Sequence, residues 1–372
     1  MSTFNFTVRA MDDQKAFSDR QFSINVKNDQ IVSTILADGS SIWTSTDFGT
    51  DALIQRPTIT TSSIMTGNPV AYGNGTWVAS NSTSYYTSPD GINWTSRSYP
   101  TVNDTTYSTE FPSDIPRTSA VYFNITFKSN TFILMVNFYT SGSRNALYIF
   151  TSDDAVNWTQ MGNTNAVSGS LGSSYFYAVN PDIVYDGTTI YFIYGTTSSS
   201  SALISSSYYV KSVTDPSTGN ITWTSVSIKD SGGTARSVMG LYYINGLWIA
   251  ANTTSTYLTS NDLVTWTTRS SGITSRFTPF YYVNGSLVTF FSSVLMSGSN
   301  KMGFYSSNDG VSWKGVAMSA SISGTPEVVM YNGSLYVTPS NSTTLYMTSD
   351  GATSSIVNYA VPSTTIGMAS IT

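Results

Sequence analysis

The stretch SPDGINW, residues 88–94, decides the fold because variants of it recur along the chain. The pattern is a serine or threonine, an aspartate two positions later, a residue that tolerates positive φ, and then a tryptophan. An aspartate that accepts backbone N–H groups beside a glycine is typical of a tight turn between two strands, and the tryptophan packs as the second strand begins. We call this turn the Asp turn. Its other copies are SDDAVNW (152–158), SNDLVTW (260–266), SNDGVSW (307–313) and the tryptophan-free TSDGATS (348–354).

A second phrase, centred on Asn-Gly or Asp-Gly between alternating apolar residues, precedes the Asp turns at a similar offset. It is the strongest short-range signal of a β-hairpin. Each unit is therefore expected to contain a strand, this NG turn, a strand, a variable loop, a strand, an Asp turn and a last strand. Four antiparallel strands repeated in tandem are typical of the blades of a β-propeller. The copies are YGNGTWVAS (72–80), YDGTTIYFI (185–193), YINGLWIAA (243–251), YVNGSLVTF (282–290), YNGSLYVTP (331–339) and the diverged FKSNTFILM (127–135).

Composition limits the class of protein. The 372 residues are 40% hydrophobic, enough for a large core, and only 10% are charged, so Ser, Thr, Asn and Gly must provide solubility. These residues suit strands and turns, and we expect almost no helix. A net charge of −5 without a Lys/Arg cluster argues against nucleic acid or an anionic membrane as a partner.

Cysteine and histidine are both absent. Their absence excludes disulfides, zinc–thiolate sites and the Ser-His-Asp and Cys-His mechanisms. We therefore expect no cofactor and no metal site. The chain has no apolar run long enough to span a bilayer, and its start, MSTFNFTVRAMDDQ, lacks the profile of a secretion signal, so we expect synthesis in a cytoplasm.

Counting the two phrases gives six complete units, residues 62–100, 120–162, 181–229, 238–271, 279–318 and 326–362. Residues 31–57 before them contain an Asp turn at Asp47 but have no room for a fourth strand, and residues 363–372 after them form one strand. We predict that this C-terminal strand completes the N-terminal blade, which closes a seven-bladed ring and protects every sheet edge. Six blades with an outlying N-terminal sheet are the alternative. In the third unit, TDPSTGNITW (214–223) predicts a longer turn.

Residues 1–29 form a separate anchor in this interpretation, and residues 30–372 form the propeller. The segment FNFTVRAMDDQKAFSDRQFSINVKND (4–29) alternates apolar and polar residues on both sides of a polar loop, which predicts a hairpin. It resembles the last hairpin of the cadherin-like or putative-Ig domains of phage and bacterial surface proteins. Two isolated strands are marginal in water, so we expect this hairpin to pack on another chain as an assembly contact.

The repeated phrase itself resembles the Asp-box, or BNR, repeat of propellers such as sialidases, sortilin-type receptors and many phage proteins, and the resemblance covers about residues 30–372. It is specific for the fold and weak for function. In that family the box lies on the turn between the two outer strands and is structural. The resemblance therefore implies a structural role for Asp47, Asp90, Asp154, Asp262, Asp309 and Asp350.

A sialidase activity is not supported, because the resemblance does not extend to the arginine triad, the Tyr/Glu pair or the early Arg-Ile-Pro of those enzymes. Ile115, Pro116 and Arg117 have the wrong order, and Glu110 and Glu327 are the only glutamates. A different carbohydrate-active enzyme, a glycosidase with paired carboxylates or a Ca²⁺-assisted lyase, is the alternative to a non-enzymatic role.

Blade topology predicts where a ligand would bind. NG turns and Asp turns both connect odd to even strands, so they emerge at one end of the ring, here called the turn face. The variable loops emerge at the opposite end, the loop face, and binding residues concentrate on loops held by a rigid scaffold. Trp43, Trp77, Trp223 and Trp248 lie in strand patterns and are expected to pack in the core. The candidate ligand residues on the loop face are Asp104, Tyr107, Glu110, Asp114, Arg117, Arg144, Tyr175, Tyr177, Arg276 and Lys301.

These features favour a structural and adhesive protein, most simply a bacteriophage virion component such as a tail, fibre or capsid decoration protein. The hairpin would attach to neighbouring virion proteins, and many copies of the propeller would contact host surface glycan or decorate the particle. A carbohydrate-active enzyme and a bacterial surface or intracellular scaffold are the competing classes.

Overall fold

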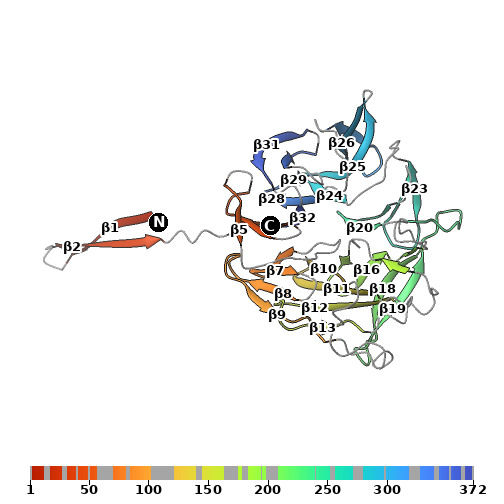
Figure 1. The fold of residues 1–372 in the computed structure, drawn as a ribbon, viewed down its shortest axis with the longest axis horizontal. Helices are drawn as coiled ribbons and strands as arrows, with labels where there is room; N and C mark the ends of the chain where they lie inside the picture. Colours follow the sequence, from red (N-terminus) through yellow and green to blue (C-terminus); the bar gives the residue numbers. More distant parts are fainter. Residues whose placement is uncertain are drawn as a thin grey trace.

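The protein is a ring of antiparallel sheets. The computed structural model describes residues 2–11, 17–26, 32–38, 41–48, 51–56, 70–80, 84–101, 121–139, 145–162, 175–177, 183–193, 195–197, 208–238, 240–251, 256–270, 280–296, 299–317, 327–338, 343–351, 353–361 and 365–370. All regular elements among these residues are strands. Seven four-stranded sheets surround a central axis, which makes the chain a seven-bladed β-propeller (Figure 1). The predicted seven-bladed ring is confirmed, and the six-bladed alternative is wrong.

Each blade is a meander whose first strand lies next to the axis. Blade 1 consists of β32 (Thr365–Ser370), β3 (Thr34–Asp38), β4 (Ile42–Ser45) and β5 (Ile54–Arg56); blade 2 of β6 (Val70–Gly73), β7 (Thr76–Ser80), β8 (Tyr85–Ser88) and β9 (Thr95–Arg97); blade 3 of β10 (Val121–Lys128), β11 (Thr131–Tyr139), β12 (Asn145–Ser152) and β13 (Thr159–Gln160); blade 4 of β15 (Val184–Tyr185), β16 (Ile190–Ile193), β18 (Tyr208–Thr214) and β19 (Ile221–Ser227).

The remaining strands follow the same plan. Blade 5 consists of β20 (Gly240–Ile244), β21 (Leu247–Ala251), β22 (Thr256–Ser260) and β23 (Thr267–Ser270); blade 6 of β24 (Phe280–Val283), β25 (Ser286–Met296), β26 (Ser299–Ser307) and β27 (Lys314–Ala317); blade 7 of β28 (Glu327–Tyr331), β29 (Ser334–Thr338), β30 (Thr344–Thr348) and β31 (Ser355–Ala360). Two short sheets stand apart from the blades: β1 (Ser2–Met11) with β2 (Phe17–Val26), and β14 (Tyr175–Tyr177) with β17 (Gly195–Thr197).

Blade 1 closes the ring by combining the two ends of the propeller. Strand β32 pairs antiparallel with β3, with Thr34 opposite Ser370 and Leu36 opposite Met368. This is the predicted closure. Because β32 occupies the edge that β3 would otherwise expose, the first blade has the same four strands as the others.

The NG turns have the backbone that a two-residue hairpin requires. Asn74, Asn245, Asn284 and Asn332 have φ of 45°, 50°, 44° and 46°, and the glycine after each also has positive φ. Asparagine and glycine adopt this left-handed conformation at the lowest cost, and two such residues in succession match the twist of the paired strands. The Asn-Gly phrases therefore fix the inner hairpins of their blades.

The hydrophobic core is divided into layers between neighbouring blades. Trp77 packs with Val32 and Ile42 between blades 1 and 2, and Met368 packs with Leu36 and Val329 between blades 7 and 1. The five other interfaces each have a cluster of the same kind. The strand tryptophans are part of this packing, since Trp77, Trp223 and Trp248 are at most 7% exposed and Trp43 is half-buried.

Two polar contacts of the same geometry join neighbouring blades inside these layers. The indole Nε1 of Trp158 donates to the Tyr85 hydroxyl at 2.9 Å, and that of Trp313 donates to the Tyr257 hydroxyl at 2.9 Å. In both cases the tryptophan closes an Asp turn and the tyrosine lies three residues before the serine of the preceding blade's Asp turn. The repeated motif thus binds each of these blades to its neighbour as well as shaping its own turn.

Candidate functional site

The Asp turn is a local network around one carboxylate. In blade 2, Asp90 Oδ1 accepts the N–H groups of Ile92 and Asn93 at 2.8 Å and the Ser88 hydroxyl at 2.9 Å, while Oδ2 accepts the Asn93 side-chain amide at 2.8 Å. Gly91 has φ 70°, and a Cβ on it would lie 2.8 Å from Val32 of blade 1. The glycine is thus required by both the turn and the neighbouring blade.

The turn carboxylates are held in the ionised form. For Asp309, N–H groups of Ser312 and Val311 lower the pKa to about 2. Burial alone would raise the pKa of Asp90, but hydrogen bonds from Asn93, Ile92 and Ser88 lower it to about 2. The pKa of Asp154 is lowered in the same way. A carboxyl group that is ionised far below neutral pH cannot serve as a general acid near pH 7.

Asparagine side chains of the NG turns reach across to the next blade on the turn face. Asn74 Nδ2 donates to the carbonyls of Asn130 and Asp153 at 3.1 and 2.9 Å, and Asn284 Nδ2 donates to the Ser349 carbonyl at 2.5 Å. Asn245 Nδ2 donates to the Tyr282 hydroxyl at 3.3 Å. These contacts join the inner hairpins of blades 2, 5 and 6 to the next blade in each case.

Three of the candidate ligand residues named from the sequence lie among the described residues. Tyr175 and Tyr177 lie on β14, which pairs with β17, so the connection between blades 3 and 4 is brought beside the variable loop of blade 4. Lys301 lies on β26 opposite Val294, in the part of the β25–β26 hairpin that extends beyond its partner strands β24 and β27. Their ligand contacts stay predictions. The other candidates lie outside the described residues: Asp104, Tyr107, Glu110, Asp114, Arg117, Arg144 and Arg276.

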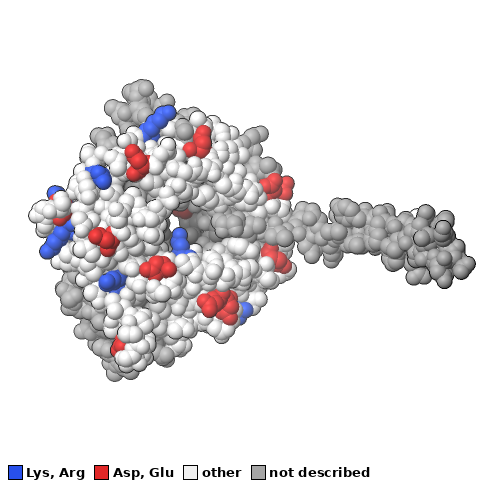
Figure 2. Space-filling view, turned by 180° about the vertical axis from the view of Figure 1, so that it is seen from behind, with Lys and Arg blue, Asp and Glu red and all other residues white. Residues whose placement is uncertain are grey.

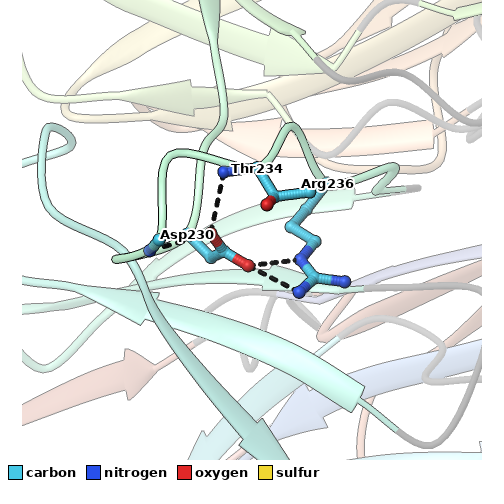
Figure 3. Close-up of polar contacts among 4 residues, drawn as sticks. Asp230, Thr234 and Arg236 are labelled. Atoms are coloured by element: carbon cyan, nitrogen blue, oxygen red, sulfur yellow. Dashed lines mark hydrogen bonds and ion pairs between the residues drawn. The ribbon is translucent and has the colours of Figure 1, made fainter.

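A described segment between blades 4 and 5, residues 228–238, contains an ion pair (Figure 3). Arg236 Nε donates to Asp230 Oδ2 at 2.7 Å, and the same oxygen lies 2.5 Å from Arg236 Nη2. Asp230 Oδ1 also accepts the N–H groups of Gly232 and Thr234 at 3.0 and 2.9 Å. The charges of Asp230 and Arg236 are therefore paired with each other, and the ion pair orders this loop.

Glu327 differs from the aspartates. It begins β28, the strand of blade 7 next to the axis, and it is half-buried. Burial raises its pKa to about 7. A carboxyl group with this pKa is suited to proton transfer near neutral pH, provided that a substrate and a second carboxylate lie within reach.

The surface has few charges and no described metal cluster. Figure 2 shows Asp/Glu and Lys/Arg side chains scattered among uncharged described residues on one face, which is hollowed near its middle. Within the described ranges, no three His, Cys, Asp or Glu residues gather as metal ligands would. No helix in the described part of the chain has the length and apolarity to cross a membrane.

Comparisons with known proteins show likeness in fold at low identity. AztD from Citrobacter koseri is 11% identical, with 98% of this chain and 94% of that chain covered and a TM-score of 0.47. Virginiamycin B lyase from Staphylococcus aureus is 10% identical over 80% and 85% of the two chains, with a TM-score of 0.48. An α-L-arabinofuranosidase from Clostridium thermocellum is 17% identical over 66% and 95%, with a TM-score of 0.35. No protein-family model and no curated protein sequence matches the chain.

Glu327 was not among the candidate ligand residues named from the sequence. Its place at the start of an axial strand is readable from the YNGSLYVTP phrase that follows it.

Proposed function

We propose that the protein is a non-catalytic recognition propeller of a multicopy assembly, most simply a bacteriophage virion, and that its loop face contacts surface glycan. The observation that carries the proposal is that the described aspartates of the Asp turns hold their own turns together. Asp90, Asp154, Asp262, Asp309 and Asp350 each accept hydrogen bonds from their own turns and so build the scaffold. Weak glycan contacts become effective when many copies bind together.

The surface chemistry also supports recognition of carbohydrate. Tyrosine and hydroxyl or amide side chains on a surface of low charge can stack on sugar rings and bond their hydroxyl groups. The ladder of β14 and β17 places Tyr175 and Tyr177 opposite Thr197 and Gly195 on the loop face, where a rigid scaffold supports them.

The assembly role rests on the N-terminal hairpin. Strands β1 and β2 pair along their whole length, with Phe4 opposite Ile24 and Phe6 opposite Phe22, in a sheet that contains no other strand. A two-stranded sheet needs further packing to be stable in water. We propose that neighbouring proteins of the assembly provide it, and that the propeller projects from them.

Binding of the purified, bead-displayed protein to bacterial surface polysaccharides tests the recognition role. We expect Y175A and Y177A to reduce binding, while Y243A retains it, because Tyr243 lies on the turn face and is 48% exposed. Unchanged binding by both loop-face variants would contradict the proposal. A protein that is monomeric, absent from any particle and active on a polysaccharide would overturn the assembly role as well.

The carbohydrate-active alternative is favoured by one observation, the raised pKa of Glu327 beside the axis. If the protein is an enzyme, reducing sugar is released from a polysaccharide and E327Q or E110Q abolishes the release. Release that both variants retain would point to neither glutamate as the catalytic acid.

A further inference from the structure

The turns of the turn face carry charge of one sign. Hydrogen bonds from the turn hold many of these carboxyl groups ionised, as the N–H of Ser312 does for Asp309, whose pKa is lowered to about 2. Lys128 and Lys314 lie at strand ends beside the turns. The NG turns, the Asp turns and their blade-4 equivalents themselves contain neither lysine nor arginine, and they contain these aspartates: Asp47, Asp51, Asp90, Asp153, Asp154, Asp186, Asp215, Asp262, Asp309 and Asp350.

The same face exposes apolar side chains at a repeated position. Val156, Val264 and Val311 each lie two residues after the aspartate of their Asp turn, and they are 38%, 79% and 42% exposed. Tyr243 and Tyr282, each two residues before the asparagine of an NG turn, are exposed as well. Exposed apolar side chains surrounded by polar groups are typical of a protein contact surface.

The N-terminal hairpin is tethered to this face. The Ser33 N–H donates to the carbonyl of Ser45, directly before the Asp turn of blade 1, at 2.8 Å, and Val32 lies against Gly91 in the Asp turn of blade 2. The chain therefore enters the ring at the turn face. Only residues 27–31 separate Val32 from β2, and a chain of this length spans at most about 20 Å. Any protein that holds the hairpin is thus brought beside the aspartates and valines.

We propose that the turn face docks on the protein of the assembly that holds the hairpin, and that this protein presents lysine or arginine around apolar side chains. The inference rests on the proposed function, which supplies the assembly. Basic side chains complement the aspartates, and the exposed valines and tyrosines provide apolar contact. The turn face of a second copy does not fit, because carboxylates would meet carboxylates. The loop face then points away from the assembly, towards its ligand.

Single-cysteine variants test the orientation, because the chain has no cysteine of its own. V311C lies on the turn face and Y208C at the loop-face start of β18, and the native residues are 42% and 43% exposed. Maleimide should label both variants at similar rates in the purified full-length chain. In the assembly isolated from cells that make each variant, V311C should react about tenfold or more slowly, since a docked face excludes the reagent, while Y208C keeps its rate.

Charge and apolar variants test the chemistry of the contact. Among the described residues, Asp153 is bonded through its carbonyl, to Asn74, and not through its carboxylate, so D153K reverses a charge without removing a contact of the turn. D153K and V264S should each speed dissociation of the chain from the assembly by about threefold or more. I356S is the matched control, because Ile356 is 59% exposed on the outer strand β31, and it should dissociate as the wild type does.

Salt completes the test, since it should speed dissociation of the wild type more than that of D153K. Equal labelling of V311C in the free and the assembled chain, protection of Y208C in its place, or unchanged dissociation of both D153K and V264S would overturn the proposal and leave the assembly role standing. Rapid formation of a disulfide-linked dimer by purified V311C would assign the face to a second copy instead. Absence of the chain from any assembly would end the proposed function itself.

Discussion

At the scale of single residues, one carboxylate organises each of the Asp turns of blades 2, 3, 5 and 6 by accepting two successive N–H groups. The turns differ in how they meet the demand for positive φ at the next position. Gly310 has φ 68°, whereas Ala155 and Leu263 occupy the same position with φ 58° and 62°. Those two side chains are held in a backbone region that favours glycine, because the Asp network and the packing around them fix the turn.

Replacing the turn aspartate of blade 6 tests the network. D309A removes the acceptor of the Val311 and Ser312 N–H groups, both bonded at 2.7–2.8 Å, and should lower the free energy of unfolding by about 1–2 kcal/mol. D309N keeps one oxygen and should lose less than half of that. Urea unfolding followed by tryptophan fluorescence measures both variants, and equal losses would show that the charge matters more than the oxygen.

The turn aspartates and Glu327 predict opposite responses to pH. The pKa of Asp309 in the folded protein, about 2, lies below the ordinary value of 3.8, so its contribution to stability is present above pH 3.8 and is lost as the pH falls towards 2. The pKa of Glu327 in the folded protein, about 7, lies above the ordinary value of 4.5, so stability falls as the pH rises from 4.5 to 7. We expect greatest stability near the lower end of that interval.

The variant E327Q isolates the second effect. Because the neutral amide needs no proton, the variant should lose the decline in unfolding free energy between pH 4.5 and 7, which amounts to at most about 3 kcal/mol for the wild type. Urea unfolding at a series of pH values measures the difference. A decline of equal size in E327Q would assign it to other groups.

At the scale of elements, neighbouring blades are joined by residues of the repeated motif. Tyr257 accepts from Trp313 and donates to the Gly310 carbonyl, so one hydroxyl group connects blade 5 to the Asp turn of blade 6. Tyr209 and Trp266 have the same relation between blades 4 and 5. There the indole Nε1 is buried and has no hydrogen-bond partner among the described residues. The tyrosine–tryptophan pair therefore forms a hydrogen bond between blades 5 and 6 but none between blades 4 and 5.

This contrast gives a matched pair of variants. Y257F leaves the Trp313 N–H and the Gly310 carbonyl without their partner and should cost about 1–3 kcal/mol of unfolding free energy. Y209F removes a hydroxyl group for which no hydrogen bond to a described residue is seen, and should change stability by no more than about 0.5 kcal/mol. Denaturant unfolding compares them. Similar losses in the two variants would exclude the indole–hydroxyl contact as the source.

The sequence predicted the repeated parts of these elements well and the unique parts poorly. NG and Asp turns depend on local backbone chemistry, so Asn74 and Gly91 identify their turns without reference to the rest of the chain. The pairing of β14 with β17 depends on segments that meet only in the folded ring. Local patterns do not encode those meetings, which is why the site was predicted only as a face.

At the scale of the whole molecule, the ring depends on one strand that closes it. Met368 of β32 packs with Leu36 and Leu345, and β32 covers the edge of β3. Truncation after residue 361 should expose that edge and lower the melting temperature sharply, with aggregation visible in gel filtration. Removal of residues 1–29 should leave the melting temperature of the ring nearly unchanged, and a truncated ring that melts like the full chain would contradict the closure argument.

The pairing of Thr34 with Ser370 also sets the order of events in folding. Loop-closure entropy makes contacts between residues so distant in sequence slow to form, while each hairpin can form from its own neighbours. During synthesis, the edge of β3 therefore stays unpaired until β32 has been made. A translation product that stops early keeps that side open and can pair with another unfinished chain, so aborted synthesis should yield intermolecular strand exchange, whereas a finished chain seals itself.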